Sequence, residues 1–503
     1  MVDGGAAARA PTPPLIDLPQ SFAKTYGIVL RNVNESGMVV AMREGADPLT
    51  LLRVLRYFAI PADVEIADSV TFDRYLSDQY AMDGSASAMV ETITAGNSDL
   101  FSDMLPGADD LPHSANDTLV IRLIYGIIAE AVRQGASNIH VEPYETGLVV
   151  RTRTDGILKQ CLRLPANIVP MIVRRIKVMA RLDIAEHRIP QDGRIGLTLA
   201  GKLVDVHVST LPSRAGERIV LCIVNEESAN IPLELPGMSA DTLRTLRDAL
   251  SEPNGVILVT GPTGSGTTTT LYAGLKGLND GTRNILTVED PIEHPVEGIG
   301  QTEVSANLGV TFVNGLRAIL LQDPDVVMVS EIRNSETARV AFQAALTGHL
   351  VLTTMHANDA VGAITGIRDM KVEPFLLAST LRAVIAQRLV RRLCSSCREI
   401  IQADGNAASL LGLDKGTAMY QAVGCGECDN TGFQGLIGVF EAVRVDATIR
   451  RLINDGGDEA ILARHAFINK PNLSSAARKL VLAGYTTAQE AIRISRREDI
   501  ANV

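Results

Sequence analysis

The sequence has no excess of basic residues and no membrane-length apolar run, and its N-terminal stretch leads us to expect no secretory leader. Its 503 residues carry 47 Lys and Arg against 58 Asp and Glu, which gives a net charge of −11. Proteins that hold nucleic-acid backbones usually present a basic surface, so we expect no nucleic-acid partner. A membrane span needs about 20 apolar residues. The richest apolar stretches are broken by charges, as VIRLIYGIIAEAV is by Arg122 and Glu130, so we expect no direct membrane insertion.

The N-terminal stretch MVDGGAAARAPTPP contains Asp3 and no apolar core. It therefore does not have the pattern of a secretory signal, and we expect a cytoplasmic protein. Any association with a membrane should then depend on a partner.

Cysteine is also scarce, since six cysteines in a chain of this length do not make a disulfide scaffold. Four of them form two CxxC pairs, and 27 residues separate the pairs: Cys394, Cys397, Cys425 and Cys428. Two converging pairs supply four thiolates for tetrahedral zinc. We expect a closed structural site that holds a loop-rich insert together and does no chemistry.

Composition and periodicity divide the chain into segments. Residues 1–14 should be disordered because they are rich in Ala, Gly and Pro, and 96–114 is typical of a linker because it is dense in Asp, Ser, Gly and Pro. Helical patterns such as LTLLRVLRYFAI predict a small helical N-terminal domain over 15–95. One long amphipathic helix followed by alternating runs predicts an α+β domain over 115–230.

From residue 238 to 503, helical patterns alternate with short, wholly apolar runs such as VILVT, ILTV, VVMVS and LVLTT. This alternation predicts an α/β domain with a mostly parallel sheet covered on both faces. Ligands in such sheets bind at the carboxyl ends of the strands. The zinc module at 394–430 and the C-terminal helices belong to this domain.

The segment GPTGSGTTTT at 261–270 stands between an apparent strand and an apparent helix, which is the setting of a phosphate-binding loop. The pattern GxxxxGK[ST] requires a lysine after its last glycine, and Thr267 occupies that position. An ordinary glycine-rich turn is the alternative. Backbone N–H groups would still form an anion-binding concavity, and the Thr268 hydroxyl would still be available to Mg²⁺. The candidate nucleotide-binding residues are Gly261, Pro262, Thr263, Gly264, Ser265, Gly266, Thr267, Thr268 and Thr269.

Acidic residues follow two of the apolar runs. Glu331 comes after VVMVS, as a Walker B strand delivers an acid toward Mg²⁺. The segment TVEDPIE places Glu289, Asp290 and Glu293 at another strand end, where a carboxylate could orient or deprotonate water. For Glu331, an ordinary buried strand followed by a surface glutamate is an equal alternative. Taken alone, TVEDPIE is more typical of a solvated loop.

The order of these segments resembles the secretion ATPases of type II secretion and type IV pilus assembly. The resemblance covers roughly residues 115–430, and its most specific stretches are ASNIHVEPYE, RIKVMARLDIAEHRIPQDGR, VDVHVSTLPSRAGERIV, GPTGSGTTTTLYA, ILTVEDPIE, GIGQTEV, LRAILLQDPDVVMVSEIR, TGHLVLTTMHAN and VEPFLLAST. The early segment DLPQSFAKTYGIVL is similar to the type II branch, whose first domain docks on an inner-membrane platform protein.

The resemblance implies a RecA-like P-loop ATPase domain, a ring of six chains and a site for ATP and Mg²⁺ between the α+β and ATPase domains. It also implies the zinc module. By resemblance, Glu331 is the Walker B acid and Arg317 is a retained family arginine. The aspartate box is Glu289, Asp290 and Glu293, and the histidine box contains His349 and His356.

The chain departs from the family where cations are expected. Besides Thr267, the residues His207, Cys222 and Leu321 stand where the family has arginine. Phosphoryl transfer depends on positive charge around the phosphate oxygens, so we expect weak or absent turnover. Two alternatives remain open: a non-catalytic subunit or adaptor in a homo-hexamer or mixed ring, and an ATPase of type IV pilus assembly.

Overall fold

The computed structural model describes parts of residues 23–75 and then residues 115–199, 202–224, 232–305 and 308–499. The chain divides into two compact units, Met1–Ile223 and Val224–Val503. The expected disordered segment 1–14 and the expected linker 96–114 lie outside the described residues.

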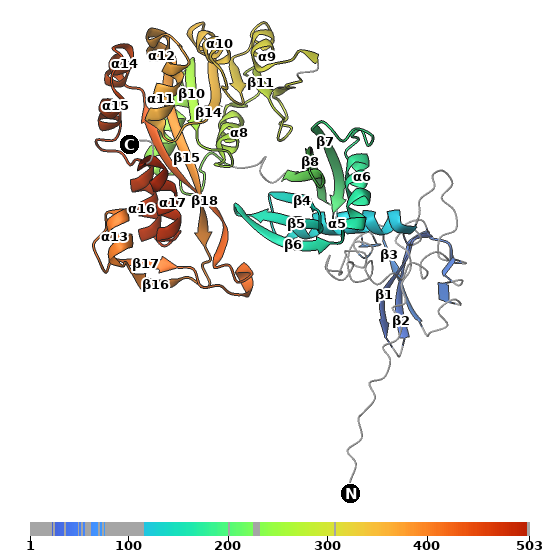
Figure 1. Ribbon diagram of the computed structural model, residues 1–503. Coiled ribbons are helices and arrows are strands. Elements are labelled where there is room, and N and C mark those ends of the chain that lie inside the picture. The colour runs from blue at the N-terminus through green and yellow to red at the C-terminus, as the bar shows by residue number, and fades with distance from the viewer. Residues whose placement is uncertain are drawn as a thin grey trace. The chain divides into compact units, whose positions relative to one another are not determined.

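The N-terminal part of the first unit contains a three-stranded sheet in the order β1-β2-β3 (Figure 1). Its strands are β1 Ile28–Asn34, β2 Gly37–Arg43 and β3 Ala62–Ala67. Helical residues such as Leu51 and Val54 pack on this sheet, as the helical pattern predicts. The description of this domain as helical was nevertheless incomplete. Neighbouring residues of β1 and of β2 are buried in different clusters, so these two strands lack the alternation that marks a half-buried strand.

The rest of the first unit is an α+β fold. A six-stranded sheet has the order β6-β5-β4-β9-β8-β7, and it shares one core with two helices. Its elements are α5 Ala115–Arg133, β4 Asn138–Tyr144, β5 Gly147–Thr154, β6 Ile157–Leu164, α6 Val169–Met179, β7 Gln191–Leu199, β8 Lys202–Ser213 and β9 Gly216–Val224. Val141, Val150 and Ile219 from the sheet meet Ile124 and Ile172 from the helices in that core.

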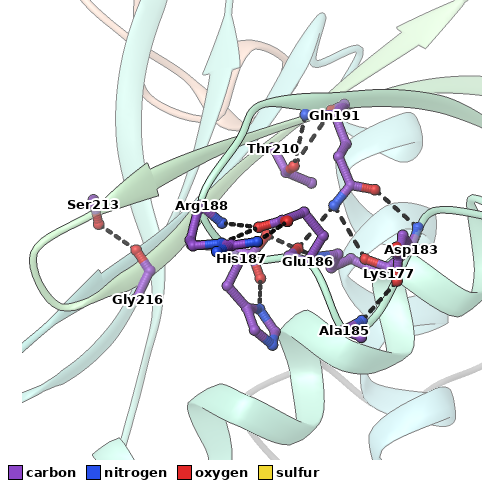
Figure 2. A network of polar contacts seen from close by, with 11 residues as sticks. Lys177, Asp183, Ala185, Glu186, His187, Arg188, Gln191, Thr210, Ser213 and Gly216 are labelled. Atoms are coloured by element: carbon purple, nitrogen blue, oxygen red, sulfur yellow. Dashed lines mark hydrogen bonds and ion pairs between the residues drawn. The ribbon is translucent and has the colours of Figure 1, made fainter.

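A buried ion pair fixes the loop between α6 and β7. Lys177 on α6 is 0% exposed, and its Nζ donates to Glu217 at 2.8 Å and to the Glu186 carbonyl at 2.6 Å. Gln191 holds the same loop through the carbonyls of Asp183 and Glu186, and His187 Nδ1 lies 2.5 Å from the second carboxylate oxygen of Glu217 (Figure 2). The ammonium group of Lys177 and the side-chain amide of Gln191 thus hold the backbone of this loop in place.

The second unit is built on a seven-stranded sheet in the order β12-β11-β13-β14-β10-β15-β18 (Figure 1). The neighbouring strands are parallel except for the antiparallel pair β15–β18. The strands are β10 Gly255–Thr260, β11 Ile285–Glu289, β12 Gly300–Glu303, β13 Val326–Val329, β14 Leu350–Met355, β15 Leu381–Leu393 and β18 Phe433–Arg444.

Helices cover both faces of this sheet. Val256 and Leu258 of β10 face one core, which includes α9 to α12 and the C-terminal helices, and Ile257 and Val259 face the other core with α7 and α8. The helices are α7 Ala240–Leu250, α8 Thr267–Leu278, α9 Phe312–Ile319, α10 Ser335–Leu346, α11 Ala360–Asp369, α12 Pro374–Thr380, α14 Ala447–Asn454, α15 Glu459–Ala466, α16 Leu473–Leu482 and α17 Ala488–Asp499. The predicted α/β fold class is confirmed.

An insert between β15 and β18 contains β16 Glu399–Gln402, α13 Gly405–Leu411 and β17 Ala418–Gln421. The strands β16 and β17 form a separate antiparallel pair. Within the described parts of the chain, every helix is too short or too polar to cross a membrane.

Candidate functional site

Four adjacent parallel strands, β11, β13, β14 and β10, end at the same edge of the sheet. The residues after these ends are Asp290, Glu331, His356 and the glycine loop that begins at Gly261. Segments far apart in the sequence therefore converge at one edge, where ligands of parallel sheets bind.

The glycine loop connects β10 to α8 and needs its glycines for conformation and for space. Gly264 and Gly266 have φ of +77° and +81°, the left-handed region that favours glycine. A Cβ on Gly266 would lie 2.8 Å from the side-chain nitrogen of Gln387, and one on Gly261 would lie 2.5 Å from the Gln387 carbonyl oxygen. The first amides of α8 have no partner within the helix, which suits them to an anion.

Gln387 on β15 supports this loop, and it was not predicted from the sequence. Its side chain is 3% exposed, and its Oε1 accepts a hydrogen bond from Thr270 of α8 at 2.5 Å. The sequence did contain one indication of this role, because a glutamine and an arginine interrupt the apolar run AVIAQRLV. A polar residue in a buried strand needs a partner, and here the partner is in the first turn of the helix that follows the glycine loop.

Ser265 supplies a test of whether the loop fits a polar ligand. The residue is 3% exposed, and within the described part of the chain its Oγ has no hydrogen-bond partner. Because buried polar atoms are normally bonded, this hydroxyl is consistent with a loop that receives a phosphate group. The residues present therefore fit a nucleotide.

Glu289 is locked in a buried network. It is 1% exposed, and it accepts hydrogen bonds from Tyr272, from Thr287 at 2.5 Å and from Gln301 at 3.0 Å. Burial, and then the hydrogen bond to Glu289, raise the pKa of Tyr272. Gln301 also donates to the His294 carbonyl at 2.9 Å, so the network anchors the loop after β11. The hydrogen bonds of Glu289 thus fix the side chains of Tyr272 and Gln301.

Glu293 has the surroundings of a proton acceptor. The residue is exposed, yet desolvation of its carboxyl group raises its pKa, the charge of Glu289 adds to the rise, and a hydrogen bond from Thr268 opposes it. Thr268 stands in the first turn of α8. The two side chains therefore meet where the glycine loop enters the helix.

Glu331 is contacted by two side chains from different segments. Its Oε2 accepts from Arg333 Nε at 2.6 Å, and its Oε1 lies 2.9 Å from His356 Nε2. The other ring nitrogen of His356 lies 3.1 Å from the carbonyl oxygen of Gly261. Asp290 joins the cluster through Arg333 Nη1 at 3.0 Å. Arg333 was not predicted as a site residue, although it stands two residues after Glu331.

Two expected site residues lie elsewhere. His349 precedes β14, and its carbonyl oxygen accepts from the amide of Gly255 at the start of β10. It is thus at the amino edge of the sheet, about 23 Å along the strand from His356 at ~3.3 Å per residue. Arg317 on α9 pairs with Glu336 on α10 at 2.9 Å and does not join the Glu331 cluster.

Three further residues stand where the family resemblance leads us to expect arginine, one in the second unit and two in the first. Leu321 follows α9 and is 85% exposed. His207 lies on β8 and Cys222 on β9 of the first unit. The Cys222 thiol accepts from Asn138 at 2.9 Å, and burial raises its pKa.

The four cysteines meet at the base of the insert, and their sulfur atoms all lie within 4.8 Å of one another. The pairs Cys394–Cys425 and Cys397–Cys428 are separated by 3.9 and 3.8 Å. Tetrahedral zinc with Zn–S bonds of ~2.3 Å places its sulfurs about 3.8 Å apart, so the cluster fits this metal. Burial acts to raise the pKa of Cys428, but hydrogen bonds from the amides of Cys425 and Gly432 outweigh it and lower the pKa to about 6.

Comparison with known proteins agrees with this architecture. A family model described as Type II/IV secretion system protein matches residues 113–493. A second model, described as a domain of GSPII protein E, matches residues 17–80.

Curated relatives match over nearly the whole chain. The Type II secretion system protein E of Pseudomonas aeruginosa is 46% identical over 493 residues, which cover 97% of this chain and 98% of the relative. The Type II secretion system ATPase E of Vibrio cholerae is 46% identical over 485 residues, which cover 95% of this chain and 96% of the relative.

Solved structures share the fold at low identity. The Legionella pneumophila ATPase DotB has a TM-score of 0.54 at 17% identity, covering 76% of this chain and 96% of that chain. The pilus retraction motor PilT, solved with ADP, has a TM-score of 0.51 at 24% identity, covering 74% and 96%.

Proposed function

The chain belongs to the type II/IV secretion system protein family, and on that premise we propose that it is the ring ATPase of a type II secretion system. In this proposal it binds and hydrolyses ATP and thereby powers pseudopilus assembly and protein export. One observation carries the proposal most directly. His356 contacts both the first residue of the glycine loop and the carboxylate of Glu331, so the phosphate-binding and metal-binding segments meet in one cluster.

Each part of the cluster has a role that its chemistry supports. The backbone N–H groups of the glycine loop and the first turn of α8, which Pro262 lacks, would hold the phosphates. The Thr268 hydroxyl with Glu331 would hold Mg²⁺, which neutralises charge that develops on the phosphates. Glu293 is the best placed general base because it is exposed and its pKa is raised. Glu289 acts as a positioning residue through Tyr272 and Gln301.

The proposed turnover is weak. Thr267 is short and uncharged, and a charge-assisted hydrogen bond contributes roughly 1.5 to 3 kcal/mol, which is about 10- to 150-fold in affinity. A cation at the transition state contributes about 10³- to 10⁵-fold in rate. The substitutions at His207, Cys222 and Leu321 remove three more positive charges that the resemblance leads us to expect.

The same departures favour a second candidate function, a non-catalytic subunit of the ring that binds nucleotide and keeps the fold. In that case an intact ATPase would share the ring. The two candidates differ in phosphate release and agree in fold, docking and zinc.

We infer the partners from the same family. The match of residues 17–80 to a domain of GSPII protein E supports docking on inner-membrane platform proteins. The proposed protein is a peripheral component at the cytoplasmic face of the inner membrane, assembled as a hexamer or a mixed ring. Zinc bound by the four cysteines would hold together the two ends of the insert between β15 and β18.

Steady-state phosphate release from the purified assembly with Mg²⁺ and ATP tests the proposal, with Glu331→Gln as the matched control. We expect slow release by the wild-type chain and none above background by the variant. Equal rates in the two proteins would contradict hydrolysis at this site and would support the non-catalytic candidate.

A further inference from the structure

We propose that the groove between α12 and α14 binds an acidic segment of a partner protein, with an apolar side chain of that segment seated beside Phe375. This inference goes beyond the proposed function, because the groove is separate from the nucleotide site. Helix α12 ends where β15 begins, so the groove lies at the amino end of that strand. The glycine loop follows the carboxyl end of β10, which runs parallel to β15.

The walls of the groove are two helices that pack on the same core. The helices α12 and α14 lie side by side (Figure 1), and Leu377 of the first and Ile449 of the second are buried in one cluster. The groove has a volume of about 510 Å³, and the residues that line it are Phe375, Ala378, Ser379, Arg450, Arg451 and Asn454. Ligand sites usually enclose ~300–1,000 Å³, so the groove has room for more than one side chain.

Phe375 forms the apolar wall of the groove. The residue is 58% exposed, and it is the one exposed phenylalanine in the part of the chain that the structure describes. Its ring lies beside the small residue Ala378 in the groove, so apolar surface is left in water. Aromatic side chains are frequent anchors of protein interfaces. The groove therefore suits an apolar side chain of a partner.

Two consecutive arginines of α14 supply positive charge to the groove. Arg450 and Arg451 are both exposed, and within the described ranges neither has a carboxylate partner. A nearby cation does have one, since Arg444 pairs with Asp248 at 2.8 Å. The two arginines are therefore available to a ligand.

A third arginine adds to this charge. Arg382 donates to neutral groups: the carbonyl oxygen of Ser379 at 2.8 Å, and the backbone and side-chain oxygens of Asn254 at 3.0 and 2.8 Å. Burial, and then the charge of Arg450, lower the pKa of Arg382, although the charge of Glu252 acts in the opposite direction. Arg382 and Arg450 thus repel each other, and a bound carboxylate would relieve this repulsion.

These features identify the partner by its chemistry. Guanidinium groups match carboxylates with paired N–H donors, so the arginines select an acidic segment. Phe375 selects a segment that also carries a leucine, a methionine or an aromatic residue. An anionic membrane surface fits less well, because the exposed acids Glu373 and Asp455 stand at the start of α12 and the end of α14.

Peptide selection on the purified full-length protein tests this assignment. A random displayed library is selected on the wild type, on Arg450→Gln with Arg451→Gln, and on the control Arg339→Gln with Arg464→Gln, which removes two exposed arginines outside the groove. Enriched peptides are then synthesised with a fluorescent label and titrated against each protein and against Phe375→Ser. Thermal unfolding and ATP titration of every variant measure general loss of structure and effects on the nucleotide site.

We expect the wild type and the control to enrich the same peptides, in which several Asp or Glu residues flank an apolar side chain. Affinity for these peptides should fall by about 10-fold or more in the groove double variant and in Phe375→Ser, because a few arginine and aromatic side chains carry most of the binding energy of an interface. Added salt should weaken binding by the wild type. Thermal unfolding and ATP affinity should stay as in the wild type, since the replaced side chains are exposed and lie outside the nucleotide site.

Three results would overturn the proposal. If no peptide is enriched on the wild type, or the same peptides are enriched on the groove double variant, the groove holds no acidic segment. Binding of phosphatidylglycerol vesicles that depends on Arg450 and Arg451, without enriched peptides, would assign the surface to a membrane. A change of oligomeric state in the groove double variant, again without enriched peptides, would assign it to a second copy of this chain. Each of these results leaves the proposed nucleotide site untouched.

Discussion

His356 lies between the carboxylate of Glu331 and the backbone carbonyl of Gly261, at 2.9 and 3.1 Å. Both partners are hydrogen-bond acceptors, so the ring satisfies both only when each of its nitrogens carries a proton. The contact connects the segment after β13 to the glycine loop after β10.

Replacement of His356 should therefore separate the two segments. We expect His356→Ala to weaken Mg²⁺-dependent ATP binding several-fold and to lower the free energy of unfolding by about 1 kcal/mol, because one hydrogen-bonded bridge is lost. Titration of nucleotide and urea denaturation measure the two effects. Unchanged affinity would mean that the bridge has no part in nucleotide binding.

The two glutamates of the segment TVEDPIE should respond differently to the same isosteric change. Glu289→Gln should destabilise the protein by roughly 1 to 3 kcal/mol, because a buried acceptor of three hydrogen bonds gains an N–H group that faces a donor. Glu293→Gln should change stability by less than about 0.5 kcal/mol, since the residue is exposed, and should reduce phosphate release.

Urea denaturation and phosphate release of the two variants give this comparison directly. Each protein is the control for the other, because both lose one carboxylate from the same segment. If Glu289→Gln kept full stability while losing phosphate release, Glu289 and not Glu293 would be the candidate base.

The pH dependence of stability should depend on Glu490, which joins α17 to β15. Burial acts to raise the pKa of Glu490, but hydrogen bonds from Arg391 and Arg493 outweigh it and lower the pKa. A lowered pKa means that the folded state binds fewer protons, so this contribution is complete above the ordinary glutamate pKa of about 4.3 and is lost as pH falls through the lower folded value.

We therefore expect Glu490→Gln to lose roughly 1.5 to 3 kcal/mol of unfolding free energy at pH 7. The difference from the wild type should shrink as the pH falls below about 4.3. Denaturation curves at several pH values measure it. A difference that stays constant down to the acid transition would contradict a charged role for Glu490.

Removal of zinc should affect the insert more than the glycine loop. We expect one zinc per chain in the wild type, and faster proteolysis within 394–430 after chelation or in Cys425→Ser, because the four sulfurs hold this insert together. Metal analysis and limited proteolysis measure this, with Cys161→Ser as the control outside the cluster. A metal content unchanged in Cys425→Ser would contradict the four-cysteine site.

The parallel sheet and much of its site were predictable because each core strand is an uninterrupted apolar run. In a sheet buried on both faces such runs identify strands, and the residues after them lie at one edge. Glu331 was located in this way, whereas His356 was expected from the family resemblance. The same rule applied to His349 would have placed it at the other edge, since it precedes its strand.

Other features depended on tertiary contacts that carry no sequence pattern. The burial of Glu289 depends on Tyr272 and Gln301, which stand 17 residues before it and 12 residues after it. The contact of Arg333 with Asp290 spans 43 residues. In the N-terminal sheet, strands β1 and β2 were missed because burial on both faces removes the period-two signal.

The glycine loop is proposed to bind nucleotide and to hydrolyse it slowly without its lysine. A single-turnover experiment with excess protein, Mg²⁺ and labelled ATP, run beside Thr267→Lys, measures bound ATP and released phosphate together. We predict ATP binding by the wild type, phosphate release far slower than about one per second, and little gain in Thr267→Lys because other cations are also missing. Absence of bound ATP, or release near one per second by the wild type, would contradict this proposal.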